Sequence, residues 1–486
     1  MTFESAPRLG VSLFVILLTA ASIVCTSDVA RSAEVVVDAS KTVGAIRPLH
    51  GVNNGPLNFG EVVDLSPYYS QLDIPLARLH DPEWPNPDVV DIHAIFPDMN
   101  ADPADPRNYQ FSRTDDYIQP LIDAGIGIVY RLGESIEHTR KKYHVNPPRD
   151  CAKWTDVCIG IIRHYNEGWA DGHHYGITYW EIWNEPENRP TMWTGTDEEY
   201  YRLYVQAAKA IKKRWPALKV GGPSAGHQGE FVGDRVEPSS FLKGFLEHCR
   251  ANNAPLDFFS WHTYTNDPYL YARKARAIRR LLDDYGFTKT EIHLNEWNYL
   301  PDNEWIMGPE RPLERRQWFE RIGGPEGAAF LLCALIDLQT APVDVTNYYC
   351  GDTNWWGLFD RYGVPRKTFY AMRAFRMLLD TPVRVQASTS DTNLSVCAGL
   401  NQDRTMATII VAHLHKGDEK VKLQASNLPW NGPTQWQIYR LDAARDLQLV
   451  HDGVRDGGPT VHDDTCPPSS VLLIRLTPAA AAPARL

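Results

Sequence analysis

The segment YWEIWNEPEN, residues 179–188, places three glutamates (Glu181, Glu185 and Glu187) among two tryptophans, a tyrosine and an isoleucine. A carboxylate buried among apolar side chains is costly unless it is paired or used chemically. The segment is therefore expected either to form a solvated loop or to bring charged oxygens into an aromatic pocket.

In this segment Asn184 directly precedes Glu185. The same Asn-Glu pair occurs in LNEWN, residues 294–298, which contains Glu296. Both Glu185 and Glu296 end strand-like runs, and Pro186 marks the end of the first run because the residue before a proline avoids helical geometry. Two carboxylates facing one pocket are what glycosidic bond cleavage requires, one as proton donor and one as nucleophile or base. Unrelated strand-end glutamates that serve as caps or ion-pair partners are the alternative, which the paired motifs disfavour.

The elements that must position these residues alternate between strand-like and helix-like segments. The strand-like runs are residues 46–54, 73–80, 125–133, 176–185, 218–224, 257–264, 291–297 and 344–350. Helical spacing of apolar residues follows most of them, as in residues 197–215. Eight such repeats predict an α/β fold, a (β/α)8 TIM barrel over residues 46–378, with the two glutamates at the carboxyl ends of strands four and seven.

The pattern changes to short strands separated by turn residues beyond the barrel. Residues 379–478 therefore predict an accessory antiparallel β-sandwich, and the strand at 34–45 is expected to join it. The low-complexity tail, residues 479–486, is expected to be disordered.

Residues 1–33 resemble an export signal, because an arginine precedes 15 mostly apolar residues, 11–25, and small residues follow. An uncleaved anchor is the alternative, but the run is short for a membrane span. We expect a secreted or periplasmic protein with no stable membrane association after cleavage. The net charge of -11 and the lack of a basic patch disfavour a nucleic-acid partner.

The chain resembles glycoside hydrolase family 39, which includes β-xylosidases and α-L-iduronidases. The matching stretches are HGVNNGP, ARLHD, YRLGESIEH, EIWNEPE, SWHTY and LNEWN, one on each of strands one to four, six and seven. The resemblance covers most of the mature chain. It implies a retaining mechanism in which Glu185 is the acid/base and Glu296 the nucleophile. The acid is then expected to have a raised pKa, through burial or a nearby like charge.

Six further residues are predicted to bind substrate: Asn184, His262, Tyr264, Arg78, His80 and Trp356. Asn184 is expected to bond the sugar 2-hydroxyl, and a bulge could aim it inward with Glu185. Glu181 is expected deeper in the barrel and Glu187 at the rim. The alternative for the polar residues is a structural role in the barrel core, and for Trp356, with Trp355, a packed loop.

Two long loops, residues 81–113 and 299–324, are expected to form rims over the pocket. Asp98, Asn100 and Asp102 alternate as in a calcium loop, but the glycine and the terminal glutamate of an EF-hand are absent, so we expect no metal and no cofactor.

The hypothesis from the sequence is an exported retaining glycosidase, most simply an exo-β-xylosidase or related pentosidase acting on polysaccharide fragments. An endo-acting enzyme, an arabinosidase and an iduronidase-like enzyme are alternatives within the family. A carbohydrate-binding pseudoenzyme is the alternative outside it, and the presence of both glutamates argues against it. The sequence sets no oligomeric state.

Overall fold

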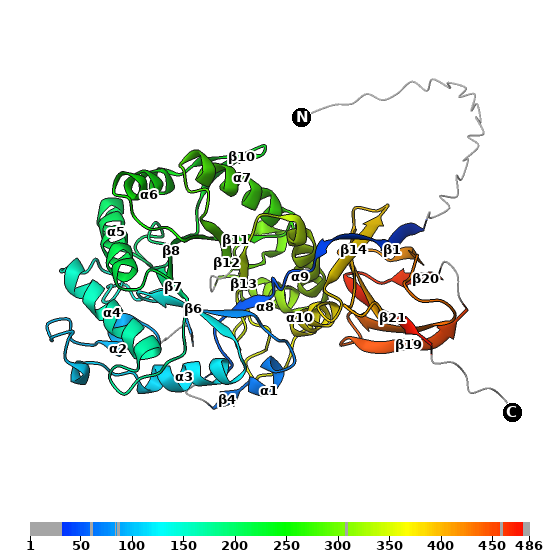
Figure 1. Ribbon diagram of the computed structural model, residues 1–486, viewed down its shortest axis with the longest axis horizontal. Helices are drawn as coiled ribbons and strands as arrows, with labels where there is room; N and C mark the ends of the chain where they lie inside the picture. Colours follow the sequence, from blue (N-terminus) through cyan, green and yellow to red (C-terminus); the bar gives the residue numbers. More distant parts are fainter. Residues whose placement is uncertain are drawn as a thin grey trace, which may run out of the picture.

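The computed structural model describes residues 32–58, 62–82, 84, 88–306, 310–456 and 460–479. It consists of a barrel and a sheet domain that lie side by side (Figure 1). Residues 1–31 of the predicted signal and residues 480–486 of the predicted tail lie outside the described residues.

Eight parallel strands close the barrel, in the order β11-β12-β13-β2-β5-β6-β7-β8. Their bounds are β2 Gly51–Asn53, β5 Leu76–Leu79, β6 Gly127–Leu132, β7 Tyr179–Ile182, β8 Lys219–Ala225, β11 Phe258–Thr265, β12 Glu291–Tyr299 and β13 Val345–Tyr348. Each belongs to one of the eight runs recognised in the sequence, and the predicted fold class, a (β/α)8 barrel with an accessory antiparallel sheet domain, is confirmed.

Helices surround the barrel strands (Figure 1). The longer helices are α3 Ser112–Asp123, α4 Cys151–Glu167, α5 Asp197–Arg214, α6 Ser240–Ala251, α7 Leu270–Asp284, α8 Pro312–Gly323, α9 Pro325–Asp337 and α10 Lys367–Leu378. The start of α5 shows why a helix begins there: the side chains of Thr196 and Glu199 each accept a hydrogen bond from the backbone N–H of the other, which satisfies two N–H groups of the first turn.

Short elements decorate the connections. They are the helices α1 Ser66–Tyr69 and α2 Ile92–Ile95, the 3-10 turns η1 Pro106–Asn108, η2 Pro301–Asn303 and η3 Leu338–Thr340, and the strand pairs β3 Leu57–Asn58 with β4 Val63–Asp64 and β9 Gly229–Val232 with β10 Arg235–Pro238. The two long loops predicted as rims therefore contain secondary structure: α2 and η1 in the first, η2 and all of α8 in the second.

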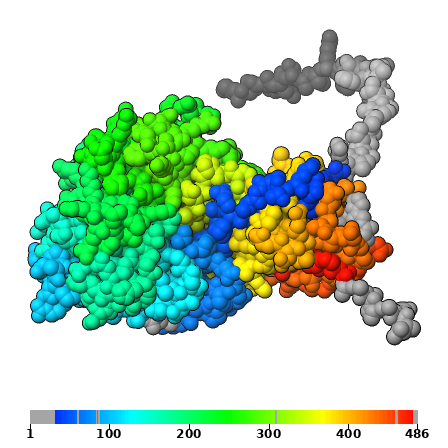
Figure 2. All heavy atoms as spheres, viewed as in Figure 1, coloured from blue at the N-terminus to red at the C-terminus, as the bar shows by residue number. Residues whose placement is uncertain are grey.

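The sheet domain has the strand order β19-β18-β21-β16-β15-β14-β1-β17-β20. Its strands are β1 Ala33–Ala45, β14 Val383–Thr389, β15 Leu394–Leu400, β16 Ala407–His413, β17 Glu419–Ser426, β18 Thr434–Leu441, β19 Gln448–Arg455, β20 Thr460–Cys466 and β21 Ser470–Pro478. The N-terminal strand β1 is antiparallel to β14 and parallel to β17. Figure 2 shows this blue segment running over the surface of the sheet domain toward the barrel.

The sheet curls over its own core, because side chains of β18, near one edge of the sheet, contact side chains of β20 at the other edge. Arg440 on β18 forms an ion pair with Asp464 on β20 at 2.5 Å, and the ring of Trp436 lies 5.9 Å from that of His462. The enclosed core includes Val35, Ile409 and Ile474. The outer faces of β16 and β21 pack against the barrel helices instead, because residues alternate between the two faces of a strand.

Leu473 and Ile410 show this second contact, since both belong to the hydrophobic core that the barrel shares with α9 and α10. Their neighbours Leu472 and Ile409 belong to the core inside the sheet domain. The two parts of the molecule are thus joined by continuous apolar packing.

Within the described ranges, no single helix has the length and apolar composition of a membrane span, and only the bent pair Pro312–Gly323 and Pro325–Thr340 meets those criteria together.

Candidate active site

The chain bends sharply after β7, and this bend directs Glu185. Strand β7 ends at Ile182, and Trp183 and Glu185 have left-handed φ values of 70° and 40°. The strand predicted from the sequence runs three residues further, to Glu185. The left-handed residues instead turn the Trp183 ring away from the pocket, into the helix layer against Trp154 and Trp193, while Glu185 enters the cavity.

The carboxyl ends of β7, β11 and β12 bring Glu185, His262 and Glu296 together. One side-chain atom of each residue lies within 4.8 Å of the other two. His262 Nδ1 lies 2.7 Å from Glu185 Oε1 and 3.6 Å from Glu296 Oε2. The two glutamates predicted to be catalytic therefore share one pocket, with an imidazole between them.

The pKa values of Glu185 and His262 move in opposite directions. Burial raises the pKa of Glu185, but the hydrogen bond and positive charge of His262 outweigh burial, and the net pKa is lowered. Burial lowers the pKa of His262, but the charge of Glu296 and the hydrogen bond to Glu185 outweigh it, and the net pKa is raised. The raised pKa predicted for Glu185 is therefore wrong, because the contribution of His262 exceeds that of burial.

Two donors hold the carboxylate of Glu296 in place. The Tyr264 hydroxyl donates to Glu296 Oε1 at 2.6 Å, and Arg78 Nη1 lies 3.3 Å from Oε2. Burial raises the pKa of Tyr264 well above its usual range, so that this hydroxyl keeps its proton. Tyr264 is thus placed to fix Glu296, and it also lines the cavity, as its predicted substrate-binding role requires.

Arg78 lies beneath the cavity and does not line it, which differs from its predicted substrate-binding role. Its guanidinium is fully buried and bonds Glu181 at 2.7 Å and Asn184 Oδ1 at 2.6 Å, besides Glu296. Such a buried cation requires these partners. Glu181 lies deep in the barrel, where the sequence analysis placed it, and accepts a second hydrogen bond from Asn295.

Asn184 and His80 are also buried, at 2% exposure each. Arg78 and Ser224 both donate to the Asn184 oxygen, and Asn184 is not among the residues that line the cavity. His80 lies 3.3 Å from Asp81, and burial with the charge of Arg78 lowers its pKa well below the usual range. His80 does not line the cavity, and its structure matches the alternative of a polar barrel-core residue.

A cavity of about 630 Å³ opens over the two glutamates. Its aromatic wall includes Trp356, as predicted, together with Trp305 and Tyr264, whose rings lie 5.2–5.6 Å apart. Asp81 and Trp84 from the first long loop and Trp305 from the second line it, so both loops contribute to the rim. A larger cavity of about 840 Å³ lies elsewhere and contains Trp355, which is therefore not part of this wall.

Glu187 is a site residue, although the sequence predicts it at the rim. It lines the cavity instead of the outer rim, and its Oε1 accepts from the backbone N–H of His227 at 2.9 Å. Its Oε2 is buried without a hydrogen-bond partner among the described residues. Burial, and then the charge of Glu185, raise the pKa of Glu187 to about 7. Only the alternation of Glu185 and Glu187 around a proline hinted at this position.

Known proteins similar to this chain include two β-xylosidases and a glucosidase. The family model for glycosyl hydrolases family 39 matches residues 64–304. A β-xylosidase of Caldicellulosiruptor saccharolyticus is 23% identical over 339 residues, 63% of this chain and 64% of that protein. A β-xylosidase of Geobacillus stearothermophilus is 27% identical over 270 residues, 49% of each chain. The chain thus spans about half to two thirds of the length of these curated relatives.

Among solved structures, a glucosidase of Croceicoccus marinus superposes with a TM-score of 0.78 at 25% identity, covering 93% of this chain and 100% of that one. A (β/α)8 barrel with two glutamates at the ends of its fourth and seventh strands, and a sheet domain packed beside it, defines the class of the barrel-type glycoside hydrolases. Within that class, the chain belongs to glycosyl hydrolases family 39.

Proposed function

We propose that the protein is a retaining glycoside hydrolase that acts by double displacement with Glu296 as nucleophile and Glu185 as acid/base. The observation that carries the proposal is the pair of strand-end carboxylates with oxygens within 4.8 Å of each other. Retaining enzymes hold the two carboxyl groups about 5–5.5 Å apart, whereas inverting enzymes need about 6.5–9.5 Å to admit a water molecule.

In the first step, a Glu296 oxygen bonds to the anomeric carbon as the bond from that carbon to the leaving oxygen breaks. Glu185 donates a proton to the leaving oxygen, and the proton held by His262 moves to Glu185. This transfer agrees with the electrostatics, because the charge of Glu296 is the largest contribution that raises the pKa of His262. Once Glu296 becomes a neutral ester, that contribution is lost and His262 releases its proton.

In the second step, Glu185 accepts a proton from water while the water oxygen bonds to the anomeric carbon. Glu296 leaves as a carboxylate, and its restored charge again favours the protonated His262. The two inversions give a product with the configuration of the substrate. The donors from Tyr264 and Arg78 stabilise Glu296 as a leaving carboxylate.

For the substrate, we favour a terminal β-xyloside or related pentoside, because two β-xylosidases are among the relatives. The aromatic wall of Trp305, Trp356 and Tyr264 supplies apolar faces for a sugar ring. A glucoside is the second candidate, favoured by the glucosidase among the similar structures. Arabinosides, iduronides and internal polysaccharide bonds remain alternatives to be tested with them.

We also propose that the protein is exported, on the basis of the apolar run at residues 11–25 behind an arginine. Its substrates would then be oligosaccharides outside the cytoplasm.

The test is a set of nitrophenyl glycosides offered to the purified protein, with β-xyloside and β-glucoside compared by kcat/KM. We expect turnover of the β-xyloside, and proton NMR early in that reaction should show the β-anomer of the free sugar first. The α-anomer as the first product would contradict double displacement. Binding of sugars without turnover of any glycoside would favour the pseudoenzyme.

A further inference from the structure

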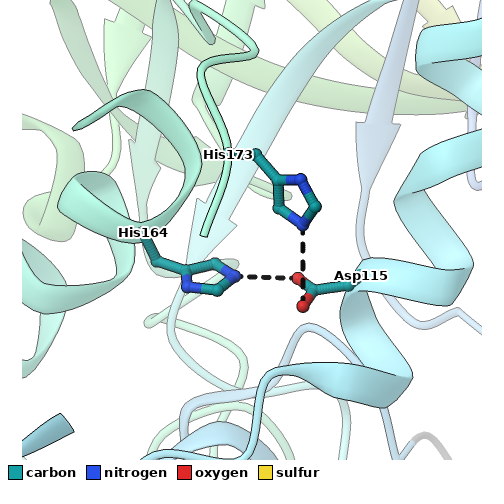
Figure 3. Close-up of side chains that lie close together, drawn as sticks. All are labelled: Asp115, His164 and His173. Carbon is teal, nitrogen blue, oxygen red and sulfur yellow. Dashed lines mark hydrogen bonds and ion pairs between the residues drawn. The ribbon is translucent and has the colours of Figure 1, made fainter. Parts of the chain in front are cut away.

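A second cluster of chemically capable side chains lies on the outside of the barrel. Asp115 on α3, His164 on α4 and His173 in the connection from α4 to β7 point toward one another (Figure 3). One ligating atom of each lies within 4.8 Å of the other two. None of the three lines the cavity around Glu185, and the connection enters β7 at the end opposite to that glutamate.

The connection after α4 is built to bring His173 back over the helix. Gly168 ends α4 with a left-handed φ of 72°, and its N–H donates to the His173 carbonyl. The His173 N–H donates in turn to the His164 carbonyl at 2.6 Å. A Cβ at Gly172 would lie 2.3 Å from that carbonyl oxygen, so glycine permits the close approach. The backbone therefore fixes the separation of the two histidines.

The hydrogen bonds of His164 identify which of its nitrogens faces Asp115 with a lone pair. His164 Nδ1 lies 3.0 Å from the carbonyl oxygen of Trp169. A carbonyl only accepts, so Nδ1 carries a hydrogen. In the neutral imidazole, Nε2 then presents its lone pair to Asp115 Oδ1 at 3.0 Å, where two acceptors face each other. Either a second proton or a cation must lie between these atoms.

His173 favours the cation. Its Nε2 is buried and makes no hydrogen bond to any described residue, and it lies 3.7 Å from Asp115 Oδ2, too far for one. A proton on this nitrogen would therefore be poorly satisfied. The same atom is placed as the third corner of a site whose other corners are Asp115 and His164 Nε2.

We propose that Asp115, His164 and His173 bind a divalent transition-metal ion of the zinc type. Bond lengths of about 2.0–2.2 Å to zinc put neighbouring ligand atoms of a tetrahedron roughly 3.3 Å apart. His164 Nε2 lies 3.0 Å from Asp115 Oδ1, and His173 Nε2 lies 3.7 Å from Oδ2, so each imidazole approaches its own oxygen of the carboxylate at a separation close to that value. Two imidazoles and one carboxylate suit zinc better than magnesium or calcium, which prefer oxygen ligands.

The surroundings of His164 match those of a metal-bound histidine, in which the second ring nitrogen donates to a carbonyl and fixes the ring orientation. Phe111 stacks on the His164 ring at 3.5 Å and fixes it further. The side chains of His173 and Asp115 are 29% and 22% exposed, so the cluster lies near the surface of the protein. The ion fastens the α4–β7 connection to α3. The site is therefore structural. Asp115 lies far from the two histidines in the sequence, and the only metal-like spacing considered in the sequence is the one around Asp98.

The test measures zinc binding to the full-length protein after chelator treatment, with zinc chloride as the probe and a zinc-binding dye as competitor. His173→Gln should bind one zinc fewer per chain than wild type, or bind it at least about 100-fold more weakly. His174→Gln is the matched control, because the adjacent His174 is exposed and outside the cluster, and it should bind as wild type does. Comparing variants cancels any zinc bound at Glu185, His262 and Glu296.

Thermal unfolding separates the metal site from a simple ion pair. Zinc at about 100 times its Kd should raise the Tm of wild type by about 3 °C and leave His173→Gln unchanged. Asp115→Asn offers an amide donor to a neutral His164, so it should keep its metal-free Tm and lose the zinc-dependent rise. Equal zinc binding in wild type and His173→Gln would overturn the proposal. So would a fall in the metal-free Tm of Asp115→Asn with no zinc-dependent rise in wild type, since that outcome identifies an imidazolium–carboxylate pair.

Discussion

At the scale of single residues, the proposed acid of this site is a pair, because Glu185 and His262 hold one proton between them. The lowered pKa of Glu185 and the raised pKa of His262 favour the proton on the imidazole. In the proposed mechanism, this proton becomes available as Glu296 is esterified. Burial alone would have given Glu185 a raised pKa. The sequence led to that expectation because nothing in it placed His262 within hydrogen-bonding distance.

The two glutamates should respond differently to substitution. Glu296→Ala should lower kcat/KM at least about 10⁴-fold on every substrate, because no glycosyl-enzyme can form. Glu185→Ala should lower turnover of an unactivated disaccharide about 10²–10⁴-fold. With a nitrophenyl glycoside it should instead show a burst, followed by slow release.

Added azide distinguishes the roles, since it needs no base and fits the gap left at Glu185. It should restore turnover of Glu185→Ala, and the glycosyl azide should keep the configuration of the substrate. Rescue of Glu296→Ala with retention, and none of Glu185→Ala, would mean that the roles are reversed.

Glu187 should make folding stability depend on pH. Its pKa in the folded protein, about 7, exceeds the ordinary value of 4.5, so the folded state holds the proton more tightly. Stability from this group is full below about pH 4.5 and is lost as pH rises through 7. The loss is at most about 3 kcal/mol, at 1.36 kcal/mol per unit of pKa.

Urea unfolding at pH 5 and pH 8 measures this dependence. Glu187→Gln should lose less stability between the two pH values than wild type. The exposed Glu247, replaced by Gln, is the control and should behave as wild type does. Equal losses in wild type and Glu187→Gln would show that Glu187 is ionised over the whole range.

At the scale of elements, the ends of β7 and β8 set the position of the acid. Gly226 follows β8, and a Cβ there would lie 2.5 Å from Glu185 Oε1 and 2.8 Å from its carboxyl carbon. Gly226→Ala should displace this carboxylate and lower kcat about 10²-fold, as expected for a shift of about 1 Å at the reacting atoms. The Tm should change little, because Gly226 has no left-handed φ.

Gly417→Ala is the control for that measurement, since its Cβ would approach only the exposed His415, at 3.5 Å. Its kcat should equal that of wild type. Unchanged kcat in Gly226→Ala would mean that Glu185 tolerates displacement and that the end of β8 does not position it.

The sequence predicted the elements better than it predicted the directions of their side chains. Eight alternations of strand and helix follow from periodicity, which is a local property. The direction of Trp183 depends instead on two left-handed residues, and a tryptophan in that conformation has no signal in the sequence. The prediction that Arg78 lies in the pocket follows from the alternation of side chains along a strand, which indicates that Arg78 faces the inside of the barrel. How deep in the barrel it lies depends instead on how far β5 extends beyond it.

At the scale of the whole molecule, α9 and α10 make barrel and sheet domain one stability unit. Leu473→Ala leaves a cavity between the sheet and these helices and should destabilise the protein by about 2–5 kcal/mol. Calorimetry should still show a single transition, and activity should be lost at the same temperature. Leu449→Ala, at an exposed position, is the control. A separate early transition in Leu473→Ala would mean that the sheet domain unfolds alone.

The place of β1 in the sheet has a consequence for the timing of synthesis. Its two neighbours, β14 and β17, begin about 350 residues later in the chain. At roughly 5–20 residues per second, a ribosome needs about 20–70 s to add them. During that interval, the apolar side chains of Val35 and Val37 have no sheet to enter. Strand β1 is thus synthesised before either of the strands with which it pairs, and the sheet domain closes only after the barrel sequence between them has been translated.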